Sequence, residues 1–156
     1  MNLRVIPFLA LVIALTLCSC KQDPETLVRG GYDEKEMDAA IARARAEVEF
    51  FVGALEKQEG TDFAVKAPVT DRGETEHFWL TDVVYRDGSF EGQIGNEPGL
   101  VKNVKLGQKW TLKKAEISDW MFFRDGKLHG NYTMRPLLKT MDKAEAEKWR
   151  LQFAVP

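Results

Sequence analysis

Cysteine and histidine are scarce in this sequence, and their positions limit the chemistry available to it. Two cysteines occur among 156 residues, and both lie within the first twenty. A domain folded from the rest of the chain therefore has no disulfide, no thiolate nucleophile and no Cys-type zinc site. The two histidines, His77 and His129, do not form a metal-spaced pair such as His-x-x-x-His. We predict neither a metal site nor a cofactor.

The sequence also lacks an excess of basic charge. Its 22 basic and 24 acidic residues give a formal net charge of −2, whereas a nucleic-acid-binding domain would show a basic field. A Gly-x-Ser-x-Gly nucleophile motif, a P-loop and a Gly-x-Gly-x-x-Gly motif are absent too. We therefore predict no nucleic-acid partner, and none of the enzyme classes that these motifs mark.

A hydrophobic run long enough to cross a membrane as a helix is missing as well. The uncharged stretch from Val5 to Leu17 is shorter than the roughly 20 residues that such a helix needs. Arg4 before it and small residues after it are typical of a secretory signal peptide. Residues 17–20, Leu-Cys-Ser-Cys, resemble the bacterial lipobox, with Cys20 as the lipidated residue. The alternative is an ordinary secretory signal with a chance cysteine.

This interpretation divides the chain into a lipoprotein signal peptide (1–19), a lipidated tether (20–31) and a single domain (32–156). More than one acyl chain on Cys20 would anchor the protein stably, so the membrane is its first predicted partner. Lys21 stands where aspartate would signal inner-membrane retention. We therefore expect attachment to the outer membrane, facing the periplasm.

Helical periodicity follows the tether. Asp33 and Glu36 form a capping-box pattern, and apolar residues recur at helical spacing from Met37 to Leu55. Near the C terminus, Thr133 and Asp142 are placed to cap further short helices.

Between these helical segments the pattern is that of strands. Residues 62–131 have a strand pattern interrupted by a loop-rich stretch at 94–108, and Asp-Gly turns at 87–88 and 125–126 predict two hairpins. The fold class that follows is α+β: an N-terminal amphipathic helix, an antiparallel sheet of about five or six strands, and one or two short C-terminal helices.

An acidic residue lies within an apolar strand pattern at residues 117–123. Both faces of this strand carry apolar side chains, so we expect it to be covered on both sides. Asp119 then sits on a largely apolar face, where a charge needs a partner. The candidates are a backbone donor, Arg135 and His77. Trp120 faces the other way.

His77 lies in a similar setting on the strand at 75–85. Alternation places Thr75, His77, Trp79, Thr81, Val83 and Tyr85 on one face, and Glu76, Phe78, Leu80 and Asp82 on the other. A histidine beside a carboxylate can act as a general base. We favour a polar structural or binding role for His77, because the two histidines of the chain form no metal-spaced pair.

The four tryptophans could line a ligand groove, since each combines a large apolar surface with one hydrogen-bond donor. Core packing is the simpler interpretation, and it is the one we adopt. The four are Trp79, Trp110, Trp120 and Trp149.

Four groups of residues, taken together, resemble the YegJ-like family, a bacterial domain of unknown function often found in predicted lipoproteins. The resemblance extends from the "AIARARAEVEFF" segment to Arg135. It departs at Asn131, where the family typically has glycine, although asparagine tolerates a left-handed backbone. The family has no established activity, so the resemblance implies a fold and a location only. The residues that carry it are Glu76, His77 and Trp79; Gly92, Asn96 and Pro98; Ile117, Asp119, Trp120 and Met121; and Tyr132, Thr133 and Arg135.

These observations favour a non-enzymatic binding module that contacts an envelope protein or a small ligand. Binding surfaces are enriched in Trp, Tyr and Arg. One alternative is an immunity-type protein that neutralises a periplasmic toxin. Another is an envelope hydrolase that uses His77 with Asp119 or Glu76 and holds an anion with Arg135. A third interpretation makes the polar residues purely structural. The candidate binding residues are Glu76, His77, Trp79, Asp119, Trp120, Tyr132 and Arg135.

Overall fold

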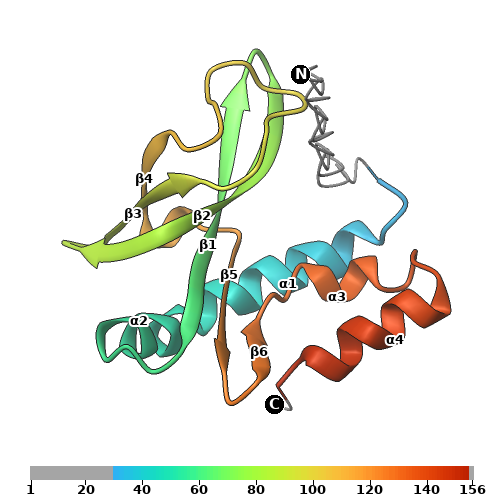
Figure 1. Ribbon diagram of the computed structural model, residues 1–156. Coiled ribbons are helices and arrows are strands. Elements are labelled where there is room, and N and C mark those ends of the chain that lie inside the picture. Colours follow the sequence, from blue (N-terminus) through green and yellow to red (C-terminus); the bar gives the residue numbers. More distant parts are fainter. Residues whose placement is uncertain (1–29, 155–156) are drawn as a thin grey trace, which may run out of the picture.

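The computed structural model describes residues 30–154, which form a six-stranded antiparallel sheet with helices packed against it. The α+β prediction is confirmed. The order across the sheet is β4-β3-β2-β1-β5-β6, as Figure 1 shows. The strands are β1 (Thr61–Asp71), β2 (Glu74–Arg86), β3 (Ser89–Ile94), β4 (Lys109–Lys113), β5 (Asp119–Arg124) and β6 (Lys127–Gly130).

The predicted signal peptide, Cys20 and the tether as far as residue 29 lie outside the described residues. The division of the chain into signal peptide, tether and domain therefore stays a prediction. Within residues 30–154, none of the helices has the length and apolar character needed to span a bilayer.

The predicted N-terminal helix forms as two segments, α1 (Glu34–Ala46) and α2 (Val48–Glu56). Glu47 separates them with φ −101° and ψ 8°, outside the helical region. Asp33 caps α1 as expected, because its Oδ1 accepts a hydrogen bond from the Glu36 amide at 3.1 Å. The Glu36 carboxylate bonds Lys139 instead of completing a capping box.

Two short helices follow the sheet, α3 (Met134–Leu137) and α4 (Lys143–Gln152), as predicted. Asp142 caps α4 by accepting from the amides of Ala144 and Glu145 at 2.8 and 3.3 Å. The capping role predicted for Thr133 is wrong. Thr133 does precede α3, but its hydroxyl donates to the carboxylate of Asp119.

Both predicted hairpin turns are present, and each has the geometry of a type I′ turn. Asp87 and Gly88 have φ values of 48° and 76°, and Asp125 and Gly126 have 53° and 69°. This turn needs a positive φ at both central residues, which Asp-Gly allows at low cost. The turns join β2 to β3 and β5 to β6.

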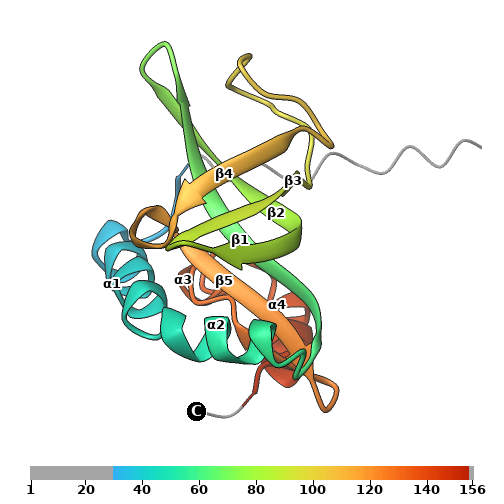
Figure 2. The same ribbon diagram turned by 90° about the vertical axis from the view of Figure 1, so that its left-hand side faces the viewer.

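Apolar side chains cover β5 on both faces, as the sequence predicted. On one face Trp120 and Phe122 pack with Phe51 of α2 in the main core. On the other, Met121 and Phe123 pack with residues of α3 and α4 in a smaller core. Figure 2 shows β5 between α1 and α2 on one side and α4 on the other. Among the residues buried in the main core are Val48, Phe51, Val52, Val65, Val69, Phe78, Leu80, Phe90, Ile94, Trp120 and Phe122.

The facing predicted for β2 is correct only as far as Thr81. A bulge interrupts its pairing with β3 between Thr81 and Val84, where Asp82 has φ 51°. The extra residue reverses the alternation, so Val83 is buried in the core and does not share the face of His77. Gly92 lies opposite the bulge, where a Cβ would be 2.7 Å from the Thr81 carbonyl oxygen.

Candidate functional site

Asp119 is fully buried, and its carboxylate is surrounded by hydrogen-bond donors. Oδ1 accepts from the amides of Trp120 and Tyr132 at 2.8 and 3.1 Å. Oδ2 accepts from the amide and the hydroxyl of Thr133 at 2.8 and 2.7 Å. Of the partners considered from the sequence, backbone donors are therefore the ones found. The carboxylate ties β5 to the segment that leads into α3.

Burial raises the pKa of Asp119 above its ordinary value, while the nearby charge of Lys66 and the hydrogen bonds from Thr133 and Trp120 oppose this effect. Lys66 Nζ donates to Thr133 Oγ1 at 2.9 Å and lies 4.6 Å from the centre of the Trp79 ring. Lys66 is opposite Trp79 on β2 and opposite Asp119 on β5. One lysine thus connects two of the predicted site residues across three strands.

His77 is bonded to a serine and not to a carboxylate. Its Nδ1 lies 2.8 Å from Ser118 Oγ, and Ser118 Oγ donates to the Lys66 carbonyl at 3.2 Å. Which of the two atoms donates in the His77–Ser118 bond depends on the tautomer of the ring. Burial of the ring, followed by the charge of Lys66, lowers the pKa of His77. Even so, more than a third of the residue surface remains exposed.

Glu76 points away from His77 and serves a loop. Its carboxylate accepts from the amides of Gly99, Leu100 and Val101, at 2.8 to 3.3 Å. Only 3% of the residue is exposed. Successive backbone amides that converge on one oxygen pair fix the loop conformation at this point. The loop connects β3 to β4 and lies along β1, where the Lys102 amide donates to Asp71.

The arrangement that a hydrolase would need is not formed by these residues. His77 bonds Ser118, while Asp119 and Glu76 are each occupied by backbone amides. The hydrolase hypothesis required convergence of His77, a carboxylate and Arg135, and within residues 30–154 no hydrogen bond or ion pair joins His77 to Asp119, Glu76 or Arg135.

Trp120 and Tyr132 are buried and belong to the main core. Trp120 Nε1 donates to the Ala44 carbonyl at 2.8 Å, which ties β5 to α1. The Tyr132 hydroxyl donates to Glu47 at the break between α1 and α2. Burial, followed by the hydrogen bond to Glu47, raises the pKa of Tyr132, so the phenol keeps its proton at physiological pH. The core interpretation therefore holds for Trp120, and Tyr132 bridges core and surface.

A groove of about 340 Å³ lies between α1 and the segment around α3. Its lining combines small or apolar side chains with charged ones. Two of the predicted site residues, Tyr132 and Arg135, are among them. The lining residues are Glu36, Ala39, Ala40, Arg43, Tyr132, Arg135, Pro136 and Lys139. We call this feature the α1–α3 groove.

Most charges in the α1–α3 groove are neutralised by neighbours. Arg43 Nε donates to Glu47 at 2.8 Å, and Lys139 Nζ donates to Glu36 at 2.5 Å. Burial alone would raise the pKa of Glu47, but the hydrogen bonds from Tyr132 and Arg43 outweigh it and lower the pKa. Glu47 therefore stays charged and balances Arg43.

Arg135 is the exception. Within residues 30–154 its Nε is the buried side-chain polar atom that has no hydrogen-bond partner. Its guanidinium carbon lies 5.4 Å from the centre of the Tyr132 ring and 4.6 Å from that of Phe153. The two rings hold the cation by cation–π attraction, and its charge helps to lower the pKa of Glu47 without forming an ion pair with it.

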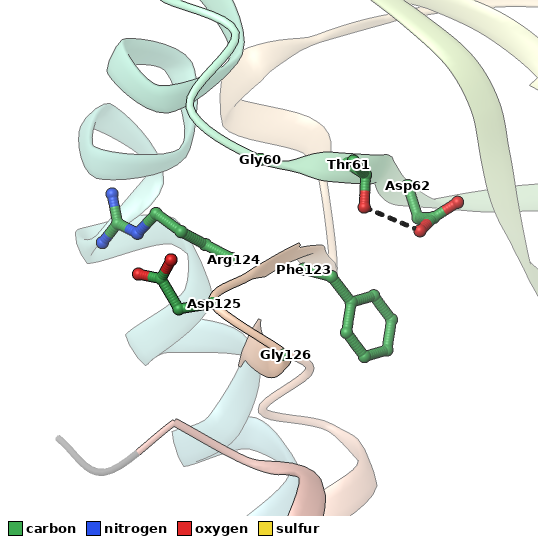
Figure 3. A pocket seen from close by; sticks show the side chains of 7 residues that line it. All are labelled: Gly60, Thr61, Asp62, Phe123, Arg124, Asp125 and Gly126. Carbon is green, nitrogen blue, oxygen red and sulfur yellow. Dashed lines mark hydrogen bonds between the residues drawn. The ribbon is translucent and has the colours of Figure 1, made fainter.

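A larger hollow of about 590 Å³ lies between the start of β1 and the β5–β6 turn. Figure 3 shows that its side chains do not converge: Arg124 and Asp125 extend to one side, and Phe123 and Asp62 to the other. Arg124 instead pairs with Glu59 at 3.5 Å. Although larger, this hollow offers no set of groups that could hold a ligand together. Among residues 30–154 no cluster of His, Cys, Asp and Glu side chains could hold a metal ion.

Several residues that complete the geometry were not among the sequence candidates. Lys66 and Ser118 join the environment of Asp119 and His77, and Arg43 and Glu47 join that of Tyr132. Lys66 had a detectable signal, because a charged residue within an alternating apolar strand faces away from the core. Arg43 and Glu47 gave no such signal, because charged side chains are usual on the solvated face of an amphipathic helix.

Comparison with known proteins is consistent with the sequence resemblance. Residues 34–155 match the model of a family described as "Uncharacterized protein conserved in bacteria (DUF2314)". The chain belongs to this DUF2314 family. It is 48% identical over 142 residues to "Uncharacterized protein YegJ" of Escherichia coli (strain K12), covering 91% of this chain and 93% of that protein.

A second relative is "Putative ankyrin repeat protein NMB1133/NMB1171" of Neisseria meningitidis serogroup B (strain ATCC BAA-335 / MC58). It is 32% identical over 138 residues, covering 79% of this chain but only 54% of that relative. The family domain therefore occurs there within a longer protein. No solved structure matches the chain.

Proposed function

We propose that this DUF2314 protein is a lipid-anchored, periplasm-facing envelope protein that acts as a non-enzymatic binding module through the α1–α3 groove. The observation that supports a binding role best is the α1–α3 groove itself, where Arg135 lies against two aromatic rings and makes no ion pair with a carboxylate of residues 30–154. Arginine and tyrosine are among the side chains enriched at binding surfaces.

The other polar candidates favour binding over catalysis. Asp119 and Glu76 together accept hydrogen bonds from backbone amides of six residues, so their carboxylate oxygens are already committed to the fold. In this proposal, the two carboxylates hold the sheet, the loop at residues 99–101 and the segment before α3 in place. Arg135 follows that segment directly, and Asp119 thereby positions the groove.

The name of one relative supports a macromolecular partner. One relative carries ankyrin repeats in its printed name, and such repeats stack into extended concave surfaces that bind other molecules. An immunity-type role against a periplasmic toxin is one form that such a partnership could take.

The anchoring part of the proposal is tested at Cys20. Cells that express the full chain are grown with a clickable palmitate analogue and then separated into soluble, inner-membrane and outer-membrane fractions. We expect label and protein in the outer-membrane fraction, and both lost from it in Cys20→Ser. Unlabelled protein in the wild-type strain would contradict lipidation, and label confined to the inner membrane would contradict the outer-membrane assignment.

The groove is tested by placing a photo-crosslinking residue at Ala39, an exposed position on α1. A matched probe at Asp87, in the β2–β3 turn, serves as the control surface. We expect adducts of defined mass from position 39 and not from position 87, and their loss when Arg135→Gln is added to a chain that still folds. Equal adducts from both positions, or none from position 39, would refute the binding role of the groove.

A further inference from the structure

Five lysines lie close together in one segment of a chain whose net charge is negative. Residues 98–115 hold these five lysines, no arginine and no acidic residue. Lys114 pairs with Glu49, and it is the one of the five that forms an ion pair with a carboxylate of residues 30–154. The other four are exposed, and they are Lys102, Lys105, Lys109 and Lys113.

Strand β4 places two of these lysines along a free edge of the sheet. Leu112 is buried in the main core and Trp110 packs against it, so Lys109 and Lys113 share the opposite face. Glu91 on β3 is the acidic residue that strand pairing sets between them. β4 is the first strand in the sheet order, and both Figure 1 and Figure 2 place it and the loop before it above α4.

An exposed leucine accompanies the lysines just before β4. Residues 105–108 form a tight turn, in which the Gln108 amide donates to the Lys105 carbonyl at 3.1 Å and Gly107 has φ 73°. Leu106 stands at the corner of this turn with 49% of its surface exposed. The turn therefore presents one apolar side chain among the lysines. We call the set the basic edge, and its members are Lys102, Lys105, Leu106, Lys109 and Lys113.

Protection of a free sheet edge explains only part of this arrangement. Lysines on an edge strand discourage pairing with another sheet, which accounts for Lys109 and Lys113. A second copy paired antiparallel through the centre of β4 would bring these two like charges opposite each other. Lys102, Lys105 and Leu106 lie in the loop before β4, where there is no strand edge to protect. The set as a whole fits an anionic partner.

The side-chain types favour an anionic lipid surface over an acidic protein. The cations of the segment are all lysines, whose ammonium groups are hydrated point charges on flexible stems. Lysine is depleted at protein–protein interfaces, whereas arginine is enriched there. An anionic bilayer attracts each nearby lysine through its surface potential, without a fixed partner geometry. One exposed leucine adds apolar contact at the boundary between headgroups and acyl chains.

The predicted anchor would keep this surface near a bilayer. Cys20 and Gly30 are ten positions apart, and an extended chain of that length spans at most about 35 Å. A tether this short raises the effective concentration of bilayer surface at the domain. A lipid anchor combined with a basic patch gives more stable membrane attachment than either alone.

We infer that the basic edge rests on the anionic phospholipid headgroups of the membrane that holds the lipid anchor, with Leu106 at the boundary of the acyl chains. This inference rests on the anchoring part of the proposed function and specifies which side of the domain faces the bilayer. None of the residues that line the α1–α3 groove belongs to the basic edge, so the two contacts use different surfaces.

The test measures how close position 106 comes to the bilayer. The full lipidated chain with Leu106→Cys, labelled with the fluorophore NBD, is reconstituted into phosphatidylcholine vesicles that contain a headgroup-nitroxide lipid and about 30% phosphatidylglycerol. Leu151→Cys, at another exposed leucine on α4, is the matched control. We expect quenching at position 106 to exceed that at 151 by at least about threefold, and to be lost without phosphatidylglycerol or at about 0.5 M salt. Equal quenching at the two positions, including none at either, or quenching at 106 that persists in pure phosphatidylcholine, would overturn the inference.

Variants assign the contact to the lysines. Glutamine keeps most of the side-chain length at an exposed position and removes the charge. Quenching at position 106 should be abolished by the triple variant Lys105→Gln, Lys109→Gln and Lys113→Gln. It should be unchanged by a control with the same loss of charge at exposed lysines elsewhere, Lys57→Gln, Lys143→Gln and Lys148→Gln. Circular dichroism checks that both variants fold, and retained quenching in the first, or equal loss in both, would refute the role of the basic edge.

Vesicle flotation separates this inference from the proposed function. Protein that floats with the vesicles but is not quenched at position 106 keeps its anchor, so only the inference fails. Protein that carries no acyl chain on Cys20 and does not float removes the anchoring proposal and the inference with it. A photo-crosslinking residue at position 106 in cells distinguishes lipid from protein. Adducts of one defined protein mass, without quenching in vesicles, would overturn the lipid assignment in favour of an acidic protein.

Discussion

Thr133 and Asp119 are joined twice, because both the amide and the hydroxyl of Thr133 donate to Asp119 Oδ2, at 2.8 and 2.7 Å. The hydroxyl also accepts from Lys66 Nζ at 2.9 Å. A short polar chain thus runs from β1 to the segment that carries Tyr132 and Arg135. It positions that segment against α1, where the groove forms.

Asp119→Asn should destabilise the protein by about 3 kcal/mol. The asparagine side chain has one acceptor oxygen where the carboxylate has two, and its NH₂ group would face amide donors in a buried site. Urea denaturation followed by tryptophan fluorescence measures the change. Asp125→Asn, in an exposed turn where asparagine tolerates the same positive φ, should change stability by less than about 0.5 kcal/mol. Equal effects of the two substitutions would show that Asp119 is not a structural centre.

Glu76→Gln should loosen the loop at residues 99–101 and cost about 2 kcal/mol, because amide donors then compete for a single neutral oxygen. Hydrogen exchange with mass spectrometry should show faster exchange in that loop, with α1 unchanged. Glu74→Gln, at an exposed position on the same strand, is the matched control. Unchanged exchange at 99–101 in Glu76→Gln would contradict the role of the carboxylate.

Gly130→Ala should cost about 4 kcal/mol or prevent folding. Gly130 has φ 76°, and a Cβ there would lie 2.2 Å from the Trp120 carbonyl oxygen. Gly126→Ala has a similar φ of 69° but meets no atom within 4 Å, so it should cost only about 1 kcal/mol. The difference between their urea midpoints isolates the clash from the backbone strain. Similar costs would mean that the backbone at Trp120 can move aside.

Both histidines should titrate below the ordinary value of 6.5. Burial lowers both pKa values, and the second cause is the charge of Lys66 for His77 and of Arg124 for His129. A lowered pKa means that the folded state binds fewer protons than the unfolded state, so stability is retained above pH 6.5 and falls as the pH drops through the folded pKa values.

Imidazole proton NMR measures these titrations directly, with His77→Gln assigning the two resonances. Lys66→Met should raise the pKa of His77 and leave that of His129 in place. A wild-type His77 that titrates at or above 6.5 would contradict the sheltered position of its ring next to Ser118.

Local signals in the sequence determined the secondary structure and much of the layering. Asp33 and Asp142 cap their helices, and the Asp-Gly pairs form their turns, because those preferences depend on a few neighbouring residues. The apolar pattern on both sides of residues 119–123 likewise predicted a strand covered on both faces. Such patterns depend on residues that are close in the sequence, so they can be recognised before the fold is known.

What the polar residues do was decided by tertiary structure. From the sequence, Asp119 could have been paired with backbone donors, Arg135 or His77. In the folded chain residues 132–133 lie next to β5, and their amides donate to the Asp119 carboxylate. The bulge at Asp82 placed Val83 on the opposite face from the predicted one. Side chains alternate between the two faces of a strand, and the extra residue of the bulge shifts this alternation by one position. The α1–α3 groove joins residues about a hundred positions apart. Partners at that separation are chosen by packing, which no local pattern in the sequence records.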